Sequence, residues 1–319
     1  SSSLQATGEQ SNFWDYTAIE EATVRTIGNS AEMPYRGVNL SAVVKSGGNN
    51  FHGSGWYNNT SSNLQSNNID EELESQGVTS GGRLAARYSF SGDLGGRIIR
   101  DKLWFYGPAR KMVDENEVLN TYKPDGSQAA LYDMAWTHTQ KVSYQMTPAN
   151  KIVGFHQYYH KYQLANLSQY RAWEYRGGLT TLIHTSKAEW QKVYGSSLVT
   201  SLQYGRYDYS SFRWTFSPQN VPPSLDQFTL IEKGPQTDIG QTSRGPRHHV
   251  KGTASWFQPD LFKGNHESKF GGNYRDNWFG RQYLDKPVDE LHRGAFVAAV
   301  QNYRLRFDNG SPFQLEVWN

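Results

Sequence analysis

The sequence predicts an all-β chain whose antiparallel strands form part of a transmembrane β-barrel, and three observations predict it. Apolar and polar side chains alternate with a period of two along several long segments. Short turns and long polar connections alternate between these segments. Aromatic residues make up 14% of the chain, although only 36% of its residues are hydrophobic. Strands with one apolar and one polar face, and with many Tyr and Trp, are typical of barrels in the outer membrane.

The composition excludes several classes of protein. Lys and Arg (32) nearly balance Asp and Glu (30), so charge gives no reason to expect a nucleic-acid partner. The chain has no cysteine, which excludes a disulfide scaffold and a thiolate zinc site. It has no run of about 18 apolar residues, so no transmembrane helix is predicted. Barrel strands do not need such a run, because their faces alternate.

The first 50 residues differ from the rest in their pattern of apolar and polar side chains. Residues 16–27 alternate loosely between apolar and polar side chains and predict a short strand or a mixed helical segment. Residues 40–44 (LSAVV) predict a buried strand. Residues 1–8 lack the charged and apolar regions of a signal peptide. We therefore expect the start of an exported protein to lie outside this sequence.

From Phe51 onward the alternation predicts four hairpins. The clearest joins residues 136–147 to residues 152–162, and Pro148 presets one dihedral of its turn. One face of its first strand carries larger side chains, Trp136, His138, Val142, Tyr144 and Met146. The opposite face carries Thr137, Thr139, Lys141, Ser143 and Gln145. The other three hairpins turn at residues 195–197, 259–265 and 308–312.

Long polar connections separate the hairpins, at residues 61–80, 115–131, 164–178, 217–244 and 285–294. In outer-membrane barrels the periplasmic turns are short and the extracellular loops are long, so this sorting supports the barrel. The pair Gly107 and Pro108 interrupts one strand. Proline has no ladder donor, which predicts that the strand ends or bulges there.

Two local motifs indicate a family. Residues 37–54 (GVNLSAVVKSGGNNFHGS) lead from an apolar strand through a Gly/Asn turn into the first aromatic strand. Residues 82–97 (GRLAARYSFSGDLGGR) are followed at 101–107 by DKLWFYG. Both motifs resemble the end of the plug and the first barrel strands of TonB-dependent outer-membrane receptors, particularly the Oar-like, carboxypeptidase-regulatory-like group. In that group a proline is usual where this chain has Arg97.

The resemblance implies that residues 1–50 are the C-terminal part of a plug domain and residues 51–319 the N-terminal portion of an outer-membrane β-barrel. It implies a junction between plug and barrel at Lys45, Ser46, Gly47, Gly48, Asn49, Phe51, His52 and Gly53. We expect Gly47 and Gly48 to allow the chain to reverse, and Asn49 and Asn50 to hydrogen-bond the backbone that they leave behind. The resemblance also implies a periplasmic turn at Gly95, Gly96, Asp101 and Lys102.

The number of predicted strands indicates that this sequence covers only part of a barrel. Barrels with a plugged lumen use about 22 strands, whereas the residues after Phe51 supply about eleven or twelve. We therefore expect the TonB box, most of the plug and the C-terminal half of the barrel to lie outside it.

Other chemistry has weaker support. On a strand His156 and His160 lie about 13 Å apart, too far for one metal ion, and His248 and His249 point to opposite faces. Four acidic residues lack the spacing of a calcium loop and indicate a solvated loop instead: Asp70, Glu71, Glu72 and Glu74. The sequence has no phosphate-binding loop and no hydrolase or zinc-protease motif. We expect no enzymatic activity, no metal site and no cofactor.

The resemblance implies a receptor in the outer membrane of Gram-negative type, taking up an unidentified nutrient with energy from the TonB–ExbB–ExbD complex. Its partners would be this complex, the outer-membrane lipid and an unknown extracellular ligand, left open between a siderophore, a glycan, a peptide and another class of molecule. Two alternatives are a passive porin, which needs no plug strand, and a soluble carbohydrate-binding β-sheet protein. In the latter, sugars would stack on Trp173, Tyr175, Trp214 and Trp278.

Overall fold

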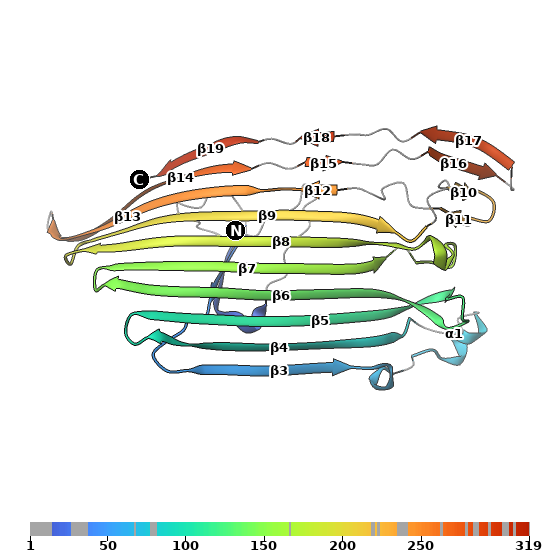
Figure 1. Cartoon of the computed structure of the whole chain (residues 1–319), viewed down its shortest axis with the longest axis horizontal. Helices are drawn as coiled ribbons and strands as arrows, with labels where there is room; N and C mark the ends of the chain where they lie inside the picture. Colours follow the sequence, from blue (N-terminus) through green and yellow to red (C-terminus); the bar gives the residue numbers. More distant parts are fainter. Residues whose placement is uncertain are drawn as a thin grey trace.

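The structure is a computed structural model that describes residues 15–26, 38–66, 68–76, 82–165, 167–217, 221, 224–234, 242–261, 264–277, 280–282, 287–292, 295–301, 306–308 and 311–318. Strands make up most of this part of the chain. They form a 13-stranded sheet, a 4-stranded sheet and a 2-stranded sheet (Figure 1). The all-β, antiparallel architecture predicted from the sequence is confirmed.

The 13-stranded sheet, called the wall below, is a meander in which consecutive strands pair antiparallel. Its first part runs through β3 (His52–Thr60), β4 (Leu84–Ile99), β5 (Leu103–Tyr122), β6 (Gln128–Thr147), β7 (Asn150–Ala165), β8 (Gly177–Tyr194) and β9 (Leu198–Thr215). In the rest of the wall, two successive segments take the place of one long strand. These are β12 (Thr242–Arg244) and β13 (Arg247–Leu261), then β14 (Gly264–Asn277) and β15 (Gly280–Gln282), then β18 (Arg306–Asp308) and β19 (Ser311–Trp318).

The 2-stranded sheet consists of β1 (Ile19–Arg25) and β2 (Asn39–Val44), preceded by the 3-10 helix η1 (Tyr16–Ala18). Figure 1 shows this small sheet behind the wall. The strand predicted at residues 40–44 is therefore present, but its predicted burial is wrong. Leu40 is 58% exposed, and among the described strands β2 pairs only with β1 in a two-stranded sheet.

The remaining elements gather at one end of the wall. They include the 4-stranded sheet of β10 (Ser224–Asp226), β11 (Glu232–Lys233), β16 (Pro287–His292) and β17 (Ala295–Gln301). The connections also carry the helices η2 (Ser62–Leu64), α1 (Glu71–Ser75) and η3 (Trp173–Tyr175). In the part of the chain that the structure describes, no helix is long and apolar enough to cross a membrane.

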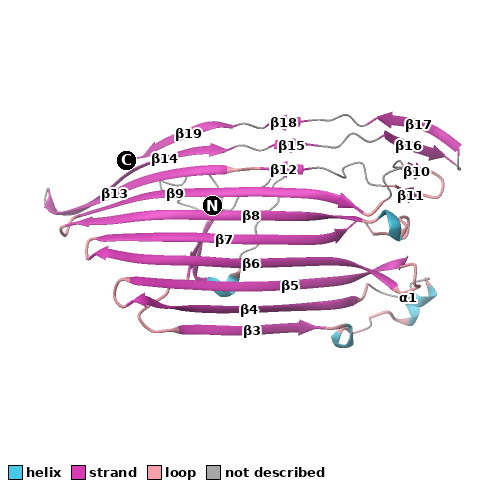
Figure 2. Cartoon of the chain, viewed as in Figure 1, coloured by secondary structure: helices cyan, strands magenta, loops and turns pink. Residues whose placement is uncertain are grey.

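The two ends of the wall differ as the sequence predicts. Short turns join β4 to β5, β6 to β7 and β8 to β9 at one end, and the longer connections lie at the other (Figure 2). One predicted connection is wrong. Residues 115–131 continue the ladder of β5 and β6, with Glu115 opposite Tyr132 and Glu117 opposite Ala130. Backbone pairing prolongs this hairpin although its side chains have become polar.

Three of the four predicted hairpins are confirmed by the pairs β6 and β7, β8 and β9, and β13 and β14. The hairpin predicted at residues 308–312 is wrong. Gly280 pairs with Asp308 and Asn277 pairs with Ser311, so β18 and β19 follow one another along the same edge. The Asp-Asn-Gly sequence favours a local turn, but the longer ladder with β14 and β15 overrides it.

The predicted break at Pro108 is also wrong. Strand β5 continues through it, and Pro108 pairs in register with Asp93 of β4. On the β6 side the register passes from Tyr106 opposite Lys141 to Ala109 opposite His138, with no pair recorded at Gly107 or Pro108. The missing N–H donor of Pro108 therefore weakens the ladder between β5 and β6, while the pairing with β4 keeps β5 continuous.

The wall buries small polar side chains on one face and exposes apolar ones on the other, and the buried face also carries an apolar cluster around Tyr159 and Ile183. On β6 the side chains of Thr137, Thr139 and Ser143 are buried, at 6%, 3% and 6% exposure. Val142 and Tyr144 alternate with them and are each 40% exposed. A water-soluble sheet has the opposite arrangement, so the exposed face is suited to lipid. We call it the outward face, and the face toward the small sheet the inward face.

Substitution of Val142 tests whether the outward face contacts lipid. Arginine at this position should destabilise the assembled protein by about 2–4 kcal/mol, because a charge within the membrane is costly. Leu131 is the control, since it lies on the same strand with 37% exposure but on the inward face and near the long-connection end. Leu131→Arg should change stability by about 0.5 kcal/mol or less. Urea unfolding in lipid vesicles measures both, and equal tolerance would contradict lipid contact at Val142.

Candidate functional site: the junction between the small sheet and the wall

The chain passes from the small sheet into the wall through residues 45–51, between the end of β2 and the start of β3. Gly47 lies directly against the wall at the point of passage. A Cβ atom there would overlap the carbonyl oxygen of Phe105 and lie 2.8 Å from that of Gly96. A Cβ at Gly48 would meet nothing within 4 Å. Neither residue has a positive φ, so Gly47 is required for close approach and not for the predicted reversal.

Lys45 connects the small sheet to the inward face. Its Nζ donates to the carbonyl oxygen of Thr17 at 2.8 Å and lies 3.6 Å from a carboxylate oxygen of Asp93. Asp93 is largely buried and also accepts from the Tyr106 hydroxyl at 2.7 Å and from the Ser54 amide at 2.6 Å. These bonds share one buried carboxylate between β3, β4, β5 and the incoming chain.

Two further contacts hold the small sheet against the wall. The Nζ of Lys141 on β6 donates to the carbonyl oxygen of Val44 at 2.7 Å. The Arg110 side chain on β5 donates to the Tyr16 hydroxyl at 3.1 Å, with its Cζ 4.2 Å from the Tyr16 ring centroid. The same ring packs edge-on against Trp56 at 6.3 Å. The segment before residue 51 is thus attached to β3, β5 and β6.

Asn49 binds the turn between β4 and β5, and not the backbone behind it as predicted. Its Oδ1 accepts from the Asp101 amide at 3.0 Å and from Trp104 Nε1 at 2.9 Å. Its Nδ2 donates to the Asp101 carboxylate, and its carbonyl oxygen accepts from Arg97 at 2.6 Å. Asp101 has a φ of 59°, a left-handed conformation that Asp tolerates in tight turns. Asn49 therefore supports the turn and fixes the junction to it.

The predicted turn needs a correction. Asp101 and Lys102 lie in it, but Gly95 and Gly96 lie within β4, opposite Tyr106 and Phe105. A Cβ at Gly95 would lie 2.6 Å from the His52 ring, and one at Gly96 would overlap the Phe51 ring. These glycines make room for the first aromatic side chains of the wall and do not supply turn dihedrals.

The remaining predicted junction residues contribute less distinctly. A Cβ at Gly53 would lie 2.6 Å from the Asp93 carbonyl oxygen, so this glycine also permits a close strand approach. Ser46 is exposed. The wall side of the junction was missed by sequence reasoning: Asp93, Arg97, Trp104, Tyr106, Arg110 and Lys141. The one available signal was the run of polar residues at alternate positions of the strands, which marks a face but not a partner.

Other candidates from the sequence lie apart from the junction. Strand β7 carries His156, whose Nδ1 lies 2.9 Å from Ser186 Oγ on the outward face. Asp70 caps α1 by accepting from the Leu73 amide at 2.9 Å. Within the described residues no group of three or more His, Asp or Glu side chains could hold a metal ion. Trp173 and Trp214 lie toward the long-connection end, and Trp278 lies outside the described residues.

Gly47→Ala should impair folding in the membrane, because the added methyl group collides with rigid backbone. The expected loss of stability is about 1–3 kcal/mol, as for overpacking in general. Gly48→Ala is the matched control and should stay within about 0.5 kcal/mol of the parent. The readouts are heat-modifiable migration on a gel and the urea midpoint. Equal effects of the two substitutions would show that the close approach is not required.

Asn49→Ala should loosen the junction without changing the strands. Loss of its bonds to Asp101 and Trp104 should cost about 1–2 kcal/mol, because each net hydrogen bond contributes about 0.5–1.5 kcal/mol. Asn50→Ala serves as the control, since no hydrogen bond of its side chain to the described residues is found. Limited proteolysis should cut the Asn49 variant sooner within residues 45–51. Identical cleavage rates in both variants would contradict the role of Asn49.

Comparisons with known proteins agree with this geometry. A family model for an outer membrane beta barrel domain matches residues 43–130. The TonB-dependent transporter Oar of Myxococcus xanthus is 31% identical over 97 residues, which cover 30% of this chain and 9% of Oar. The outer membrane transporter YddB of Escherichia coli has a similar fold, with a TM-score of 0.70 and 12% identity over 94% of this chain and 41% of YddB. The chain thus spans less than half of either protein. It contains an outer-membrane β-barrel domain with partial homology to a TonB-dependent transporter, and its location is the outer membrane.

Proposed function

We propose that this chain is part of a TonB-dependent outer-membrane receptor that takes up a nutrient across the outer membrane. In this proposal residues 1–50 are the C-terminal part of the plug and residues 51–319 belong to the barrel. The observation that carries the proposal is the attachment of the small sheet to the polar face of the wall through Lys45, Lys141 and Arg110. A passive porin has no need for a segment held in this way.

The contacts between the small sheet and the wall suit a segment that is held and then released. Among the described residues they are single hydrogen bonds, one ion pair and the contacts of the Tyr16 ring with Arg110 and Trp56, and not an interlocked apolar core. Each such bond contributes about 0.5–1.5 kcal/mol, so a pull on the segment can break them one after another. The junction at Gly47 and Asn49 has a denser set of contacts, which would keep the chain anchored to the wall during that movement.

The energy for this movement would come from the TonB–ExbB–ExbD complex on the periplasmic side. The partial homology to Oar supports this part of the proposal, because Oar is described as a TonB-dependent transporter. The short-turn end would face the periplasm and the long-connection end the exterior, in agreement with the loop lengths of outer-membrane barrels. The ligand would enter between the long connections, and its chemistry stays open between a siderophore, a glycan, a peptide and another class of molecule.

A reversible cross-link tests the release of the small sheet, and residues 1–319 contain no cysteine that would compete for the reagent. Tyr16→Cys with Trp56→Cys places one thiol on each side of an existing ring contact. A short bifunctional methanethiosulfonate reagent should then stop uptake of a labelled nutrient by cells that carry the full-length gene, and a reductant should restore it. The nutrient is the member of a labelled panel whose uptake depends on the gene.

The control pair is Asn58→Cys with Ser89→Cys, which are already partners on adjacent wall strands. Linking this pair should leave uptake unchanged, because it joins two parts of the wall. A protonophore should abolish uptake by the unlinked protein, since the TonB complex uses the proton gradient. Uptake that survives either the Tyr16–Trp56 link or the protonophore would identify a passive pore and refute the proposal.

A further inference from the structure

A group of histidines lies near the middle of the wall on its outward face. His138 lies on β6, His156 and His160 on β7, and His184 on β8, and these strands run side by side (Figure 1). Tyr158 pairs in register with both His138 and His184, so the three strands present these side chains on one face. Uptake along the inward face makes no use of them.

Two of these histidines come together from neighbouring strands. His156 and His160 lie about 13 Å apart along one strand, too far for one metal ion. His184 lies diagonally across from His156, with ring centroids 5.6 Å apart and ring planes inclined by 33°. Two imidazoles that bind one Zn²⁺ ion through bonds of about 2.0–2.1 Å have ring centroids about 5–6 Å apart. His156 and His184 therefore have the separation that a shared metal ion needs.

Ser186 orients the ring of His156. It lies opposite His156 on β8, and its Oγ is 2.9 Å from His156 Nδ1. In the tautomer that donates the Nδ1 proton to this oxygen, Nε2 keeps the lone pair that binds a metal ion. A hydrogen bond on the second ring nitrogen is the usual support of a metal-binding histidine.

The His184 ring is exposed and has nitrogen atoms available for a ligand. Its centroid lies 5.0 Å from that of Tyr158, and no hydrogen bond of its ring to the described residues is found. His138 lies on the other side of Tyr158, at 5.1 Å between ring centroids, so the tyrosine ring separates it from His184. The described residues supply no third imidazole or carboxylate to the pair. Water would therefore fill the remaining positions around an ion.

The surroundings of the pair are polar enough for an ion. Arg206 and Asp208 lie on β9 opposite Ser186 and His184. They form an ion pair of 2.7 Å, and their side chains are 50% and 38% exposed. Charged groups are costly in hydrocarbon, so this part of the outward face is accessible to water. Because Asp208 neutralises Arg206, the arginine charge does not oppose a bound metal ion.

We propose that His156 and His184 form a binding site for a divalent transition-metal ion, with Ser186 as a positioning residue for His156. Imidazole suits Zn²⁺, Ni²⁺ and Cu²⁺, and Cu²⁺ is bound most tightly of these ions. A bound ion links β7 to β8 and stabilises the folded wall, because it binds only where the two strands are paired. The inference is independent of TonB-dependent uptake.

Copper binding by the full-length protein tests the proposal, with the protein purified in detergent micelles without a polyhistidine tag. Titration calorimetry measures the affinity for Cu²⁺, and the electron paramagnetic resonance spectrum of the bound ion counts its nitrogen ligands. The parent protein should show a site with two nitrogen ligands. His156→Gln and His184→Gln should each weaken its affinity at least tenfold, and Ser186→Ala severalfold.

His248→Gln is the matched control and should leave the affinity unchanged. His248 also lies on the outward face, but its ring stacks on Tyr204 at 6.2 Å and not on another imidazole. The link between β7 and β8 has its own readout. Saturating Zn²⁺ should raise the urea midpoint of the parent and of His248→Gln, but not that of His184→Gln.

Three results would overturn the proposal. The first is unchanged Cu²⁺ affinity of His156→Gln or His184→Gln in protein that retains heat-modifiable migration. The second is an equal shift of the urea midpoint by Zn²⁺ in the parent and in His184→Gln. The third is a Cu²⁺ spectrum of the parent with fewer than two nitrogen ligands. This last measurement uses only the parent protein, so it decides the matter even where a variant fails to assemble.

Discussion

The constraint on which the structure depends is that the wall must satisfy its backbone hydrogen bonds within itself while its side chains face two different solvents. Strands β8 and β9 meet it by pairing without interruption from Gly177 opposite Thr215 to Tyr194 opposite Leu198. In a membrane no water replaces a lost backbone bond, so the long ladders are obligatory. The side chains then divide by alternation, and apolar ones such as Val142 point away from the buried Thr139.

This division gives the inward face its chemistry. A polar face enclosed by protein needs partners, because unsatisfied buried groups cost free energy. Asp93 finds them in Tyr106, Ser54 and Lys45, and Lys141 finds one in the Val44 carbonyl oxygen. The small sheet therefore completes bonds that the wall alone leaves open. Attachment of this segment follows from the polarity of the wall.

The sequence predicted the faces of the wall well and its turns less well. Period-two alternation placed Trp136 and Thr137 on opposite faces, and β6 has this arrangement. The alternation can be read from one strand alone, without knowledge of its neighbours. Turn predictions at Gly95 and at Asp308 failed, because local turn propensity was overridden by ladders with β5 and β15. The partners at the junction, such as Asp101 for Asn49, come from distant positions that no local pattern contains.

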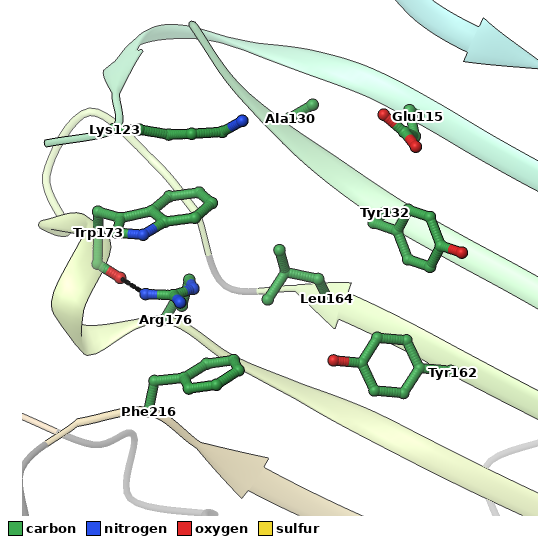
Figure 3. A pocket seen from close by; sticks show the side chains of 9 residues that line it. All are labelled: Glu115, Lys123, Ala130, Tyr132, Tyr162, Leu164, Trp173, Arg176 and Phe216. Carbon is green, nitrogen blue, oxygen red and sulfur yellow. Dashed lines mark hydrogen bonds between the residues drawn. The ribbon is translucent and has the colours of Figure 1, made fainter. Parts of the chain in front are cut away.

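The cations of the wall differ in how their charges are neutralised, as Lys141 and Arg176 illustrate (Figure 3). Lys141 and Lys45 reach carbonyl or carboxylate oxygens of the chain itself, so their charges are used within the fold. Arg176 is held by two aromatic rings and one carbonyl oxygen, which orient it but leave its charge without a carboxylate among the described residues. A partly desolvated, pre-oriented cation gains most from an anion supplied from outside.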